Sequence, residues 1–324
     1  MVIVSPSLAS ANNGNWQTAR RWASLLRPGH AVRITTQWPD ERGAEDIVML
    51  ALHAGRSAAA IQAWSERRPG RGLGVVLTGT DLYGDFAGEP EVLRSLDLAQ
   101  RLVVLQDQAP LALPGHVRDK ARVIYQSTPS RQALSKTSRW LRAVAVGHLR
   151  AVKGPGTLFA AARRLPLGAD IQLRHVGEAE GAWAEEARAT EAHCAAYRWL
   201  GALPHAAACR AIQRAHVLVH TSLAEGGAHV VMEAVRSGTP VLASRIPGNV
   251  GMLGSDYSGY FDPGDAEGLV RLLVQCRREQ QADDPARTLL SRLRAQCDAR
   301  APLFDPDSER RALLHLVHDL QDAR

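Results

Sequence analysis

The sequence predicts an α/β protein with two domains, each formed by a parallel sheet and covering helices. Short apolar runs rich in Val, Ile and Leu alternate with longer segments in which apolar residues recur at helical spacing. Loops of small residues, several with glycine, join a run to the next helical segment, which is the order of a βαβ unit. A length of 324 residues exceeds one ordinary domain and favours two cores.

The same patterns place the individual elements along the chain. The predicted strands are residues 1–6, 31–36, 46–52, 73–77, 101–105 and 123–124 in the first half, and 144–146, 171–176, 197–200, 216–221 and 239–244 in the second. The predicted helices are residues 16–26, 56–66, 157–165, 183–195, 206–215, 230–235, 266–277 and 308–320. Residues 246–251, which contain two glycines and a proline, are predicted to form a loop.

Composition and charge exclude several classes of function. The net charge is +6, but the basic residues are scattered and aromatic residues make up only 5% of the chain, so nucleic-acid binding is not indicated. A small anionic substrate fits the charge equally well. No apolar run is long enough for a membrane span, the first residues lack the basic region of a signal peptide, and the four cysteines show no metal or disulfide spacing. We therefore expect a cytoplasmic protein without membrane insertion; the sequence gives no indication of an oligomeric state.

The most informative stretch is residues 216–244, which reads as strand, Gly-rich loop, helix and strand. Gly227 and Ala228 are too small to block a ligand. The first N–H groups of the helix, near Ala228, His229 and Val230, have no acceptor within that helix. Such a helix end attracts anions, so the loop is a candidate phosphate site.

Two carboxylates bracket this loop, Glu225 and, eight residues later, Glu233. Ionised carboxylates only accept hydrogen bonds, and sugar hydroxyls donate them. Acids beside a phosphate site therefore predict a nucleotide sugar as ligand. The alternative is a Gly-rich turn before a core helix whose glutamates face solvent.

A second candidate site follows the strand at residues 144–146. Its loop carries His148, Arg150 and Lys153, and cations at the carboxyl end of a strand can reach a diphosphate without being buried unpaired. Lys153 is one of three lysines among 39 basic residues. The alternative is a solvated surface lysine.

Two loops of the first half are further candidates, because ligands collect at the carboxyl ends of parallel strands. The first contains Asn12, Gly14 and Asn15, and the other contains Thr80 and Asp81, which we expect to approach the acceptor. Asn and Gly are also ordinary turn residues, and Asp81 serves equally well as a cap of a helix or turn.

The two sites of the second half together resemble a known family. Glu225 and Glu233, followed by Ser237-Gly238-Thr239-Pro240, are similar to the E-x7-E signature of retaining glycosyltransferases with the GT-B fold. Residues 147–154, which begin at Gly147, resemble the family's G-R-L-x-x-x-K-G element, with Lys153 and Gly154 matching and His148 at the usual Arg position.

This resemblance implies a GT-B fold, in which two Rossmann-like domains face each other across a cleft and the last helix crosses back onto the first domain. The expected domains are residues 1–137 on the acceptor side, residues 138–304 for the nucleotide sugar and residues 305–324 as the returning helix.

The resemblance also implies a role for each matching residue. Lys153, helped by Arg150 or His148, would hold the diphosphate, Glu225 the sugar hydroxyls and Glu233 the ribose, while Leu200 and Gly201 would seat the base. Thr78 stands where the family often has a histidine, and threonine cannot exchange a proton near neutral pH. Neither a cofactor nor a divalent metal is expected, and the D-x-D string at residues 305–307 reads as a turn because its middle residue is proline.

A narrower resemblance concerns residues 225–231 and 246–254, which are similar to the selenosugar synthases of selenoneine biosynthesis. It implies UDP-N-acetylglucosamine as donor and selenophosphate as acceptor, both small-molecule partners. Two alternatives share the same motifs: a glycosyltransferase acting on hydroxyl acceptors, and a non-catalytic protein that binds a nucleotide sugar.

Overall fold

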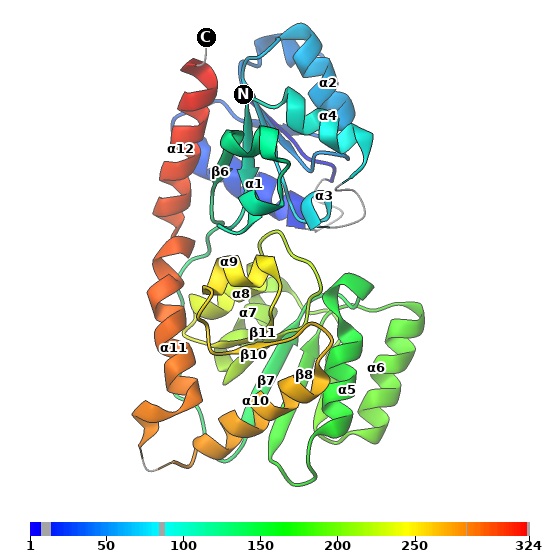
Figure 1. Ribbon diagram of the computed structural model, residues 1–324, viewed down its shortest axis with the longest axis vertical. Helices are drawn as coiled ribbons and strands as arrows, with labels where there is room; N and C mark the ends of the chain where they lie inside the picture. Colours follow the sequence, from blue (N-terminus) through cyan, green and yellow to red (C-terminus); the bar gives the residue numbers. More distant parts are fainter. Residues whose placement is uncertain (8–13, 84–87, 283, 323–324) are drawn as a thin grey trace. The chain divides into compact units, whose positions relative to one another are not determined.

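The computed structural model describes residues 1–7, 14–83, 88–282 and 284–322 (Figure 1). By their contacts the residues form two compact units. The first comprises Met1–Ser127, Glu225–Gly227 and Asp305–Arg324, and the second comprises Thr128–Ala224 and Ala228–Phe304. None of the helices in the described part of the chain combines the length and the apolar character needed to cross a membrane.

The first unit is built on a six-stranded parallel sheet with the strand order β2-β1-β3-β4-β5-β6. Its strands are β1 Val2–Val4, β2 Arg33–Thr35, β3 Met49–Leu52, β4 Leu73–Val76, β5 Arg101–Val104 and β6 Ala121–Val123. Its helices are α1 Gly14–Leu26, α2 Ala58–Arg67, α3 Thr80–Tyr83, α4 Pro90–Leu98 and α12 Pro306–Asp322.

Both faces of this sheet are buried, as the unbroken apolar strands predict. Along β3, Met49 and Ala51 point into one core together with residues of α2 and α4. Leu50 and Leu52 point into the other core, which α1 and α12 cover. Alternation with a period of two thus sends successive side chains of one strand to opposite layers.

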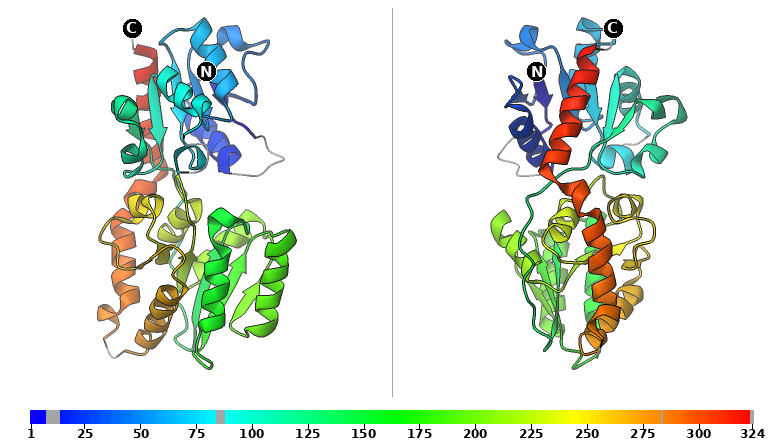
Figure 2. Two further views of the ribbon diagram at one scale, coloured as in Figure 1. Left: turned by 45° about the vertical axis from the view of Figure 1, so that its right-hand side comes forward. Right: turned by 90° about the vertical axis from the view of Figure 1, so that its left-hand side faces the viewer.

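The last helix, α12, belongs to the first unit, as the sequence predicts. Leu313, Leu316, Val317 and Leu320 lie on one side of it, at helical spacing, and are at most 1% exposed. Figures 1 and 2 show α12, in red, lying along the layer that contains α1. The helix therefore completes one of the two cores of this unit.

A buried carboxylate fixes the start of α12. The side chain of Glu309 is fully buried and accepts hydrogen bonds from Trp22 Nε1 at 2.6 Å and Arg21 Nε at 3.0 Å. It also accepts from the backbone N–H of Ser127 at 2.9 Å and from the Ser127 hydroxyl. One acid thus joins α1, the end of the N-terminal segment and α12.

The second unit has another six-stranded parallel sheet, in the order β12-β11-β10-β7-β8-β9. Its strands are β7 Leu141–Val146, β8 Ile171–Val176, β9 Tyr197–Trp199, β10 Val217–His220, β11 Val241–Ser244 and β12 Tyr260–Phe261. Its helices are α5 Pro155–Arg164, α6 Gly181–His193, α7 His205–Arg214, α8 His229–Val235, α9 Pro247–Leu253, α10 Ala266–Glu279 and α11 Leu289–Arg300. The pairs α5–α6 and α5–α10 pack side by side (Figure 2).

Two local expectations are wrong. Residues 246–251 are not a loop: Pro247–Leu253 forms α9, in which proline at the first turn is compatible with a helix and buried Asn249 donates to Ser244 O at 2.9 Å. Gly14 and Asn15 are not in the loop after β1 but in the first turn of α1. In addition, α4 and α11 are helices that the sequence patterns did not place.

Candidate functional site

The arrangement of strands in the second unit locates a candidate ligand site. Strands β7 and β10 are neighbours, yet the chain proceeds from β7 to β8 and β9 on one side and from β10 to β11 and β12 on the other. The loops after β7 and β10 therefore diverge at a topological switch point, where open α/β sheets bind ligands. The loop after β7 carries His148, Arg150 and Lys153, and the loop after β10 carries Glu225.

Hydrogen bonds join these two loops directly. Thr221 Oγ1 donates to Lys153 O at 2.9 Å, and Leu223 N–H donates to Val152 O at 2.8 Å. Lys153 ends a short 3-10 turn that begins at Ala151, and it is half-buried. The polypeptide leading to Glu225 is thus fixed against the polypeptide that carries Lys153.

Glycine is required at two positions around this junction. Gly154 has a φ of 59°, and a Cβ there would lie 2.4 Å from Thr221 O. A Cβ on Gly177, which follows β8, would lie 1.8 Å from Gly147 O. At both positions the neighbouring backbone lies too close for a residue with a side chain, so substitution of either glycine would displace the loop at residues 147–154.

The other two basic residues of this loop, His148 and Arg150, are exposed. His148 Nδ1 accepts a hydrogen bond from the backbone N–H of Glu178 at 3.2 Å, so the ring is tied to the loop after β8. Arg150 directly precedes the 3-10 turn and is exposed. Both side chains are thus exposed, and the His148 ring is the one that the backbone engages.

The predicted base-binding segment lies at the end of β9. Leu200 N–H donates to His175 O, and Gly201 O accepts from Gly177 N–H, both at 2.8 Å. Trp199 Nε1 donates to Gly177 O at 2.8 Å, and the guanidinium of Arg188 lies 5.6 Å from its ring centroid. Trp199 therefore has one side occupied by Arg188 and serves to join the loops after β8 and β9.

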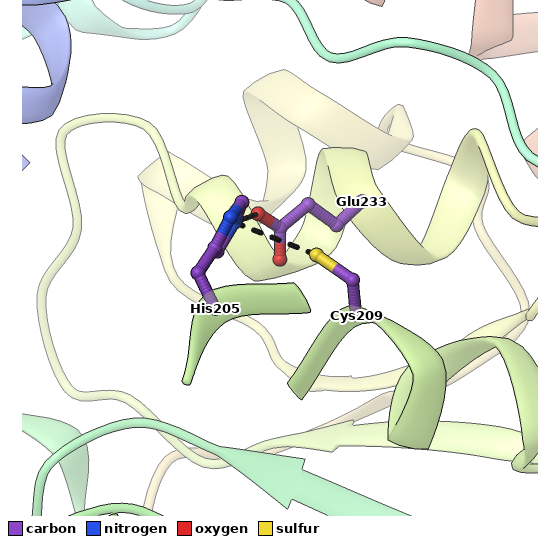
Figure 3. A group of neighbouring side chains, drawn as sticks. All are labelled: His205, Cys209 and Glu233. Atoms are coloured by element: carbon purple, nitrogen blue, oxygen red, sulfur yellow. Dashed lines mark hydrogen bonds and ion pairs between the residues drawn. The ribbon is translucent and has the colours of Figure 1, made fainter. Parts of the chain in front are cut away.

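Glu233 has a partner that sequence reasoning missed. Its carboxylate is 10% exposed and accepts from His205 Nε2 at 2.7 Å, while Cys209 Sγ lies 3.4 Å from the same nitrogen (Figure 3). The contacts with Cys209 and Glu233 raise the pKa of His205 to about 10, so the imidazolium form is favoured at neutral pH. The available signal was the four-residue spacing between His205, directly before the predicted helix at residues 206–215, and Cys209 within it.

The start of α8 is closely packed. Ala228 is its N-cap residue, is buried, and donates its N–H to Met252 Sδ at 3.1 Å. A thioether is a weak acceptor. His229 and Val230 form the first turn and are partly exposed. The preceding segment Glu225–Gly227 belongs, by its contacts, to the first unit.

In the first unit, Asp81 has a structural role. It is 2% exposed and accepts from the backbone N–H groups of Ala54, Thr78 and Gly79, each at 2.9 Å. These bonds occupy both carboxylate oxygens and fix the loop after β4 against the loop after β3. Asp81 is therefore a cap of this turn, which is the alternative given above, and it fixes the backbone of the loop that carries Thr80.

His53, which the sequence analysis did not single out, lies beside Thr80. Its Nδ1 accepts from Arg56 N–H at 3.2 Å, and its Nε2 lies 3.0 Å from Thr80 Oγ1, so the neutral ring donates from Nε2. Burial lowers the pKa of His53. It follows β3, next to the switch point between β1 and β3. Asn12 lies outside the described residues.

Comparison with known proteins agrees with this architecture. Residues 127–287 match the family model of glycosyl transferases group 1. No curated protein sequence matches the chain significantly.

Solved structures show the same fold at low sequence identity. Sucrose-phosphate synthase from Thermosynechococcus elongatus is 18% identical with a TM-score of 0.76, and HepE from Anabaena in complex with UDP-glucose is 16% identical with a TM-score of 0.72; 98% of each chain is covered in both comparisons. A TarM variant from S. aureus, in complex with fondaparinux, α-GlcNAc-glycerol and UDP, is 13% identical with a TM-score of 0.63. That match covers 83% of this chain but only 55% of TarM.

These findings agree with the two parallel sheets and with the helix α12 that returns to the first unit. Residues 127–287 therefore resemble a glycosyl transferases group 1 domain, and the chain has the GT-B fold.

Proposed function

We propose that this chain is a glycosyltransferase that takes its sugar from a uridine diphosphate sugar held by the second unit. One observation carries the proposal: the Lys153 loop and the polypeptide leading to Glu225 are hydrogen-bonded to each other at the switch point of a parallel sheet. The group 1 domain supports the reaction type, and the UDP complexes of HepE and TarM support the nucleotide.

The residues of the two motifs would divide the donor among them. Lys153, with Arg150, would neutralise the diphosphate as the bond to the sugar breaks, because a cation placed beforehand stabilises the charge that develops on the leaving group. Glu233 would accept hydrogen bonds from the ribose hydroxyls and Glu225 from those of the sugar. The backbone at Leu200 and Gly201 would face the base.

The donor and acceptor that we propose are UDP-N-acetylglucosamine and selenophosphate. The selenium of selenophosphate would attack the anomeric carbon while the bond from that carbon to the diphosphate oxygen breaks, and UDP would leave with the electron pair. Selenophosphate is an anionic nucleophile and needs no general base. Threonine at position 78 is compatible with this chemistry, because no proton has to be removed from the acceptor.

A hydroxyl acceptor is the second candidate, because the TarM complex contains α-GlcNAc-glycerol, in which the sugar is joined to an alcohol. That reaction requires removal of a hydroxyl proton. His53 is not placed to take that proton, because its Nδ1 already accepts from Arg56 N–H and its Nε2 donates to Thr80. A nucleotide-sugar binder without turnover is the third candidate.

The test is product analysis by mass spectrometry. The protein is incubated with UDP-N-acetylglucosamine and either selenophosphate or glycerol, and released UDP is quantified in parallel. We expect UDP and a product that carries the sugar on selenium. A sugar joined to glycerol, with no selenium product, would replace our proposal by the second candidate, and binding of UDP without any turnover would replace it by the third.

Two variants connect the activity to the site. Lys153→Ala should lower kcat at least about 100-fold, the range found when a group that stabilises the transition state is removed. The matched control is Arg164→Ala, which removes an exposed cation from the end of the adjacent helix α5 and should leave kcat unchanged. Equal activity of both variants would exclude Lys153 as the group that stabilises the departing UDP.

A further inference from the structure

His205, Cys209 and Glu233 form a cluster with the composition of a metal site. His205 and Cys209 are four residues apart on α7, so both project from the same face of that helix, and Glu233 comes from α8 (Figure 3). One potential ligand atom from each residue lies within 4.8 Å of the other two. Among the described residues, this is the group of three that meets that condition.

The distances are close to those of a tetrahedral zinc site. Zn–N, Zn–O and Zn–S bonds of about 2.0–2.3 Å at tetrahedral angles separate neighbouring ligand atoms by about 3.4 Å. The separation of His205 Nε2 and Cys209 Sγ is already 3.4 Å. His205 Nε2 and Glu233 Oε1 are 2.7 Å apart, so they must move apart by less than 1 Å when a metal replaces the shared proton.

Burial of the three side chains is also compatible with metal entry from solvent. Cys209 is 2% exposed and the side chain of Glu233 is 10% exposed, so two ligands are held by packing. The side chain of His205 is 74% exposed, so its ring can adjust without disturbing the core. This is the pattern of a preformed half-site that is completed by a movable ligand.

The donor set selects the kind of cation. A thiolate and an imidazole favour Zn²⁺ or a similar transition metal over Mg²⁺ and Ca²⁺, which prefer oxygen ligands. The thiolate and the carboxylate together neutralise a divalent charge. Three protein ligands leave a fourth position for water, as in open zinc sites.

We propose that His205, Cys209 and Glu233 bind Zn²⁺, and that bound Zn²⁺ excludes the nucleotide sugar. The exclusion rests on the proposed function, in which the Glu233 carboxylate accepts hydrogen bonds from the ribose. A carboxylate that coordinates a cation no longer offers that oxygen to a hydroxyl. Zinc is thus an inhibitor that competes with the donor.

The binding test uses the full-length protein after treatment with a chelator. Zn²⁺ is titrated by calorimetry, and Co²⁺ is added as a spectroscopic substitute whose charge-transfer absorption reports thiolate coordination. We expect one metal ion per chain and a thiolate band in the wild type. Cys209→Ser should abolish the band and weaken Zn²⁺ binding at least about tenfold, the lower end of what loss of groups that support a metal site costs.

Two further variants keep this result interpretable. Cys194→Ser removes a cysteine outside the cluster and should retain both the band and the affinity. His205→Gln changes an exposed side chain, so it should fold normally and yet bind Zn²⁺ at least about tenfold more weakly. Absence of a band in the wild type, or a band that survives Cys209→Ser, would overturn the site.

The exclusion is tested separately with UDP as the probe. UDP affinity is measured by calorimetry with and without saturating Zn²⁺. We expect Zn²⁺ to weaken UDP binding at least tenfold in the wild type and to have a much smaller effect in Cys209→Ser. A thiolate band together with unchanged UDP affinity would overturn the exclusion. If the metal-free protein does not bind UDP, the proposed function is overturned, and the metal site is then judged by the Co²⁺ spectrum alone.

Discussion

Replacing Glu309 by glutamine should destabilise the first unit strongly. The wild-type carboxylate is fully buried and receives hydrogen bonds from Arg21, Trp22 and Ser127. Glutamine keeps the size but removes the charge and directs an NH2 group toward donors. Removing one partner of a buried ion pair costs about 3–5 kcal/mol, and we expect about 3 kcal/mol here because glutamine still accepts at one oxygen.

The assay is differential scanning calorimetry combined with urea unfolding. A loss of about 3 kcal/mol corresponds to a fall in Tm of about 6–12 °C for a unit of this size. Asp307→Asn is the matched control, since it makes the same change of charge at an exposed position of the same helix. If the free energy of unfolding of Glu309→Gln lies within about 1 kcal/mol of the control, the buried carboxylate does not fix α12 as we argue.

Three further predictions concern the second unit. Burial lowers the pKa of His175 from 6.5 to about 4. Between these two pH values His175 is protonated in the unfolded chain but neutral in the folded chain. The resulting loss of stability is about 2 kcal/mol between pH 7.5 and pH 5; urea titrations should show this part of the loss disappearing in His175→Gln. Gly177→Ala should weaken UDP binding at least about tenfold in calorimetry by displacing Gly147, because overpacking costs about 1–3 kcal/mol, while Gly156→Ala, where a Cβ meets no atom within 4 Å, should bind UDP normally. Thr221→Val removes the hydrogen bond to Lys153 O and should weaken UDP binding about fivefold, and an unchanged affinity would contradict a coupling of the two loops.

The two sheets were predictable because their strands are buried on both faces and therefore appear as short apolar runs, as in residues 73–77 and 216–221. Helix α9 was not predictable in the same way, because Pro247, Gly248 and Gly251 are poor helix formers and its stability comes from burial in the second unit. In helix α11 the buried residues Leu289, Leu293 and Cys297 recur every four positions, so its sequence carries a helical pattern that the prediction missed. Local pattern thus predicts an element only where the element carries its own periodicity.

In the candidate site, too, some features follow from local sequence patterns and others depend on packing between elements. The positions of Lys153 and Glu225 were predictable because each lies in the loop after a strand, and the carboxyl ends of parallel strands share one edge of the sheet. The contact of His205 with Glu233 depends on how α7 packs against α8, which no local pattern specifies. The role of Asp81 depends likewise on the N–H of Ala54, which is contributed by a different loop.

The place of α12 in the first unit has a consequence for synthesis of the protein. Residues 1–127 leave the ribosome before residues 305–324, yet one layer of their core is filled by side chains that lie between Leu313 and Leu320. Until those residues emerge, the nascent N-terminal segment exposes an apolar layer, while the second unit already has nearly all of its own sequence. We therefore expect the second unit to fold first and the nascent N-terminal segment to be the part that chaperones recognise.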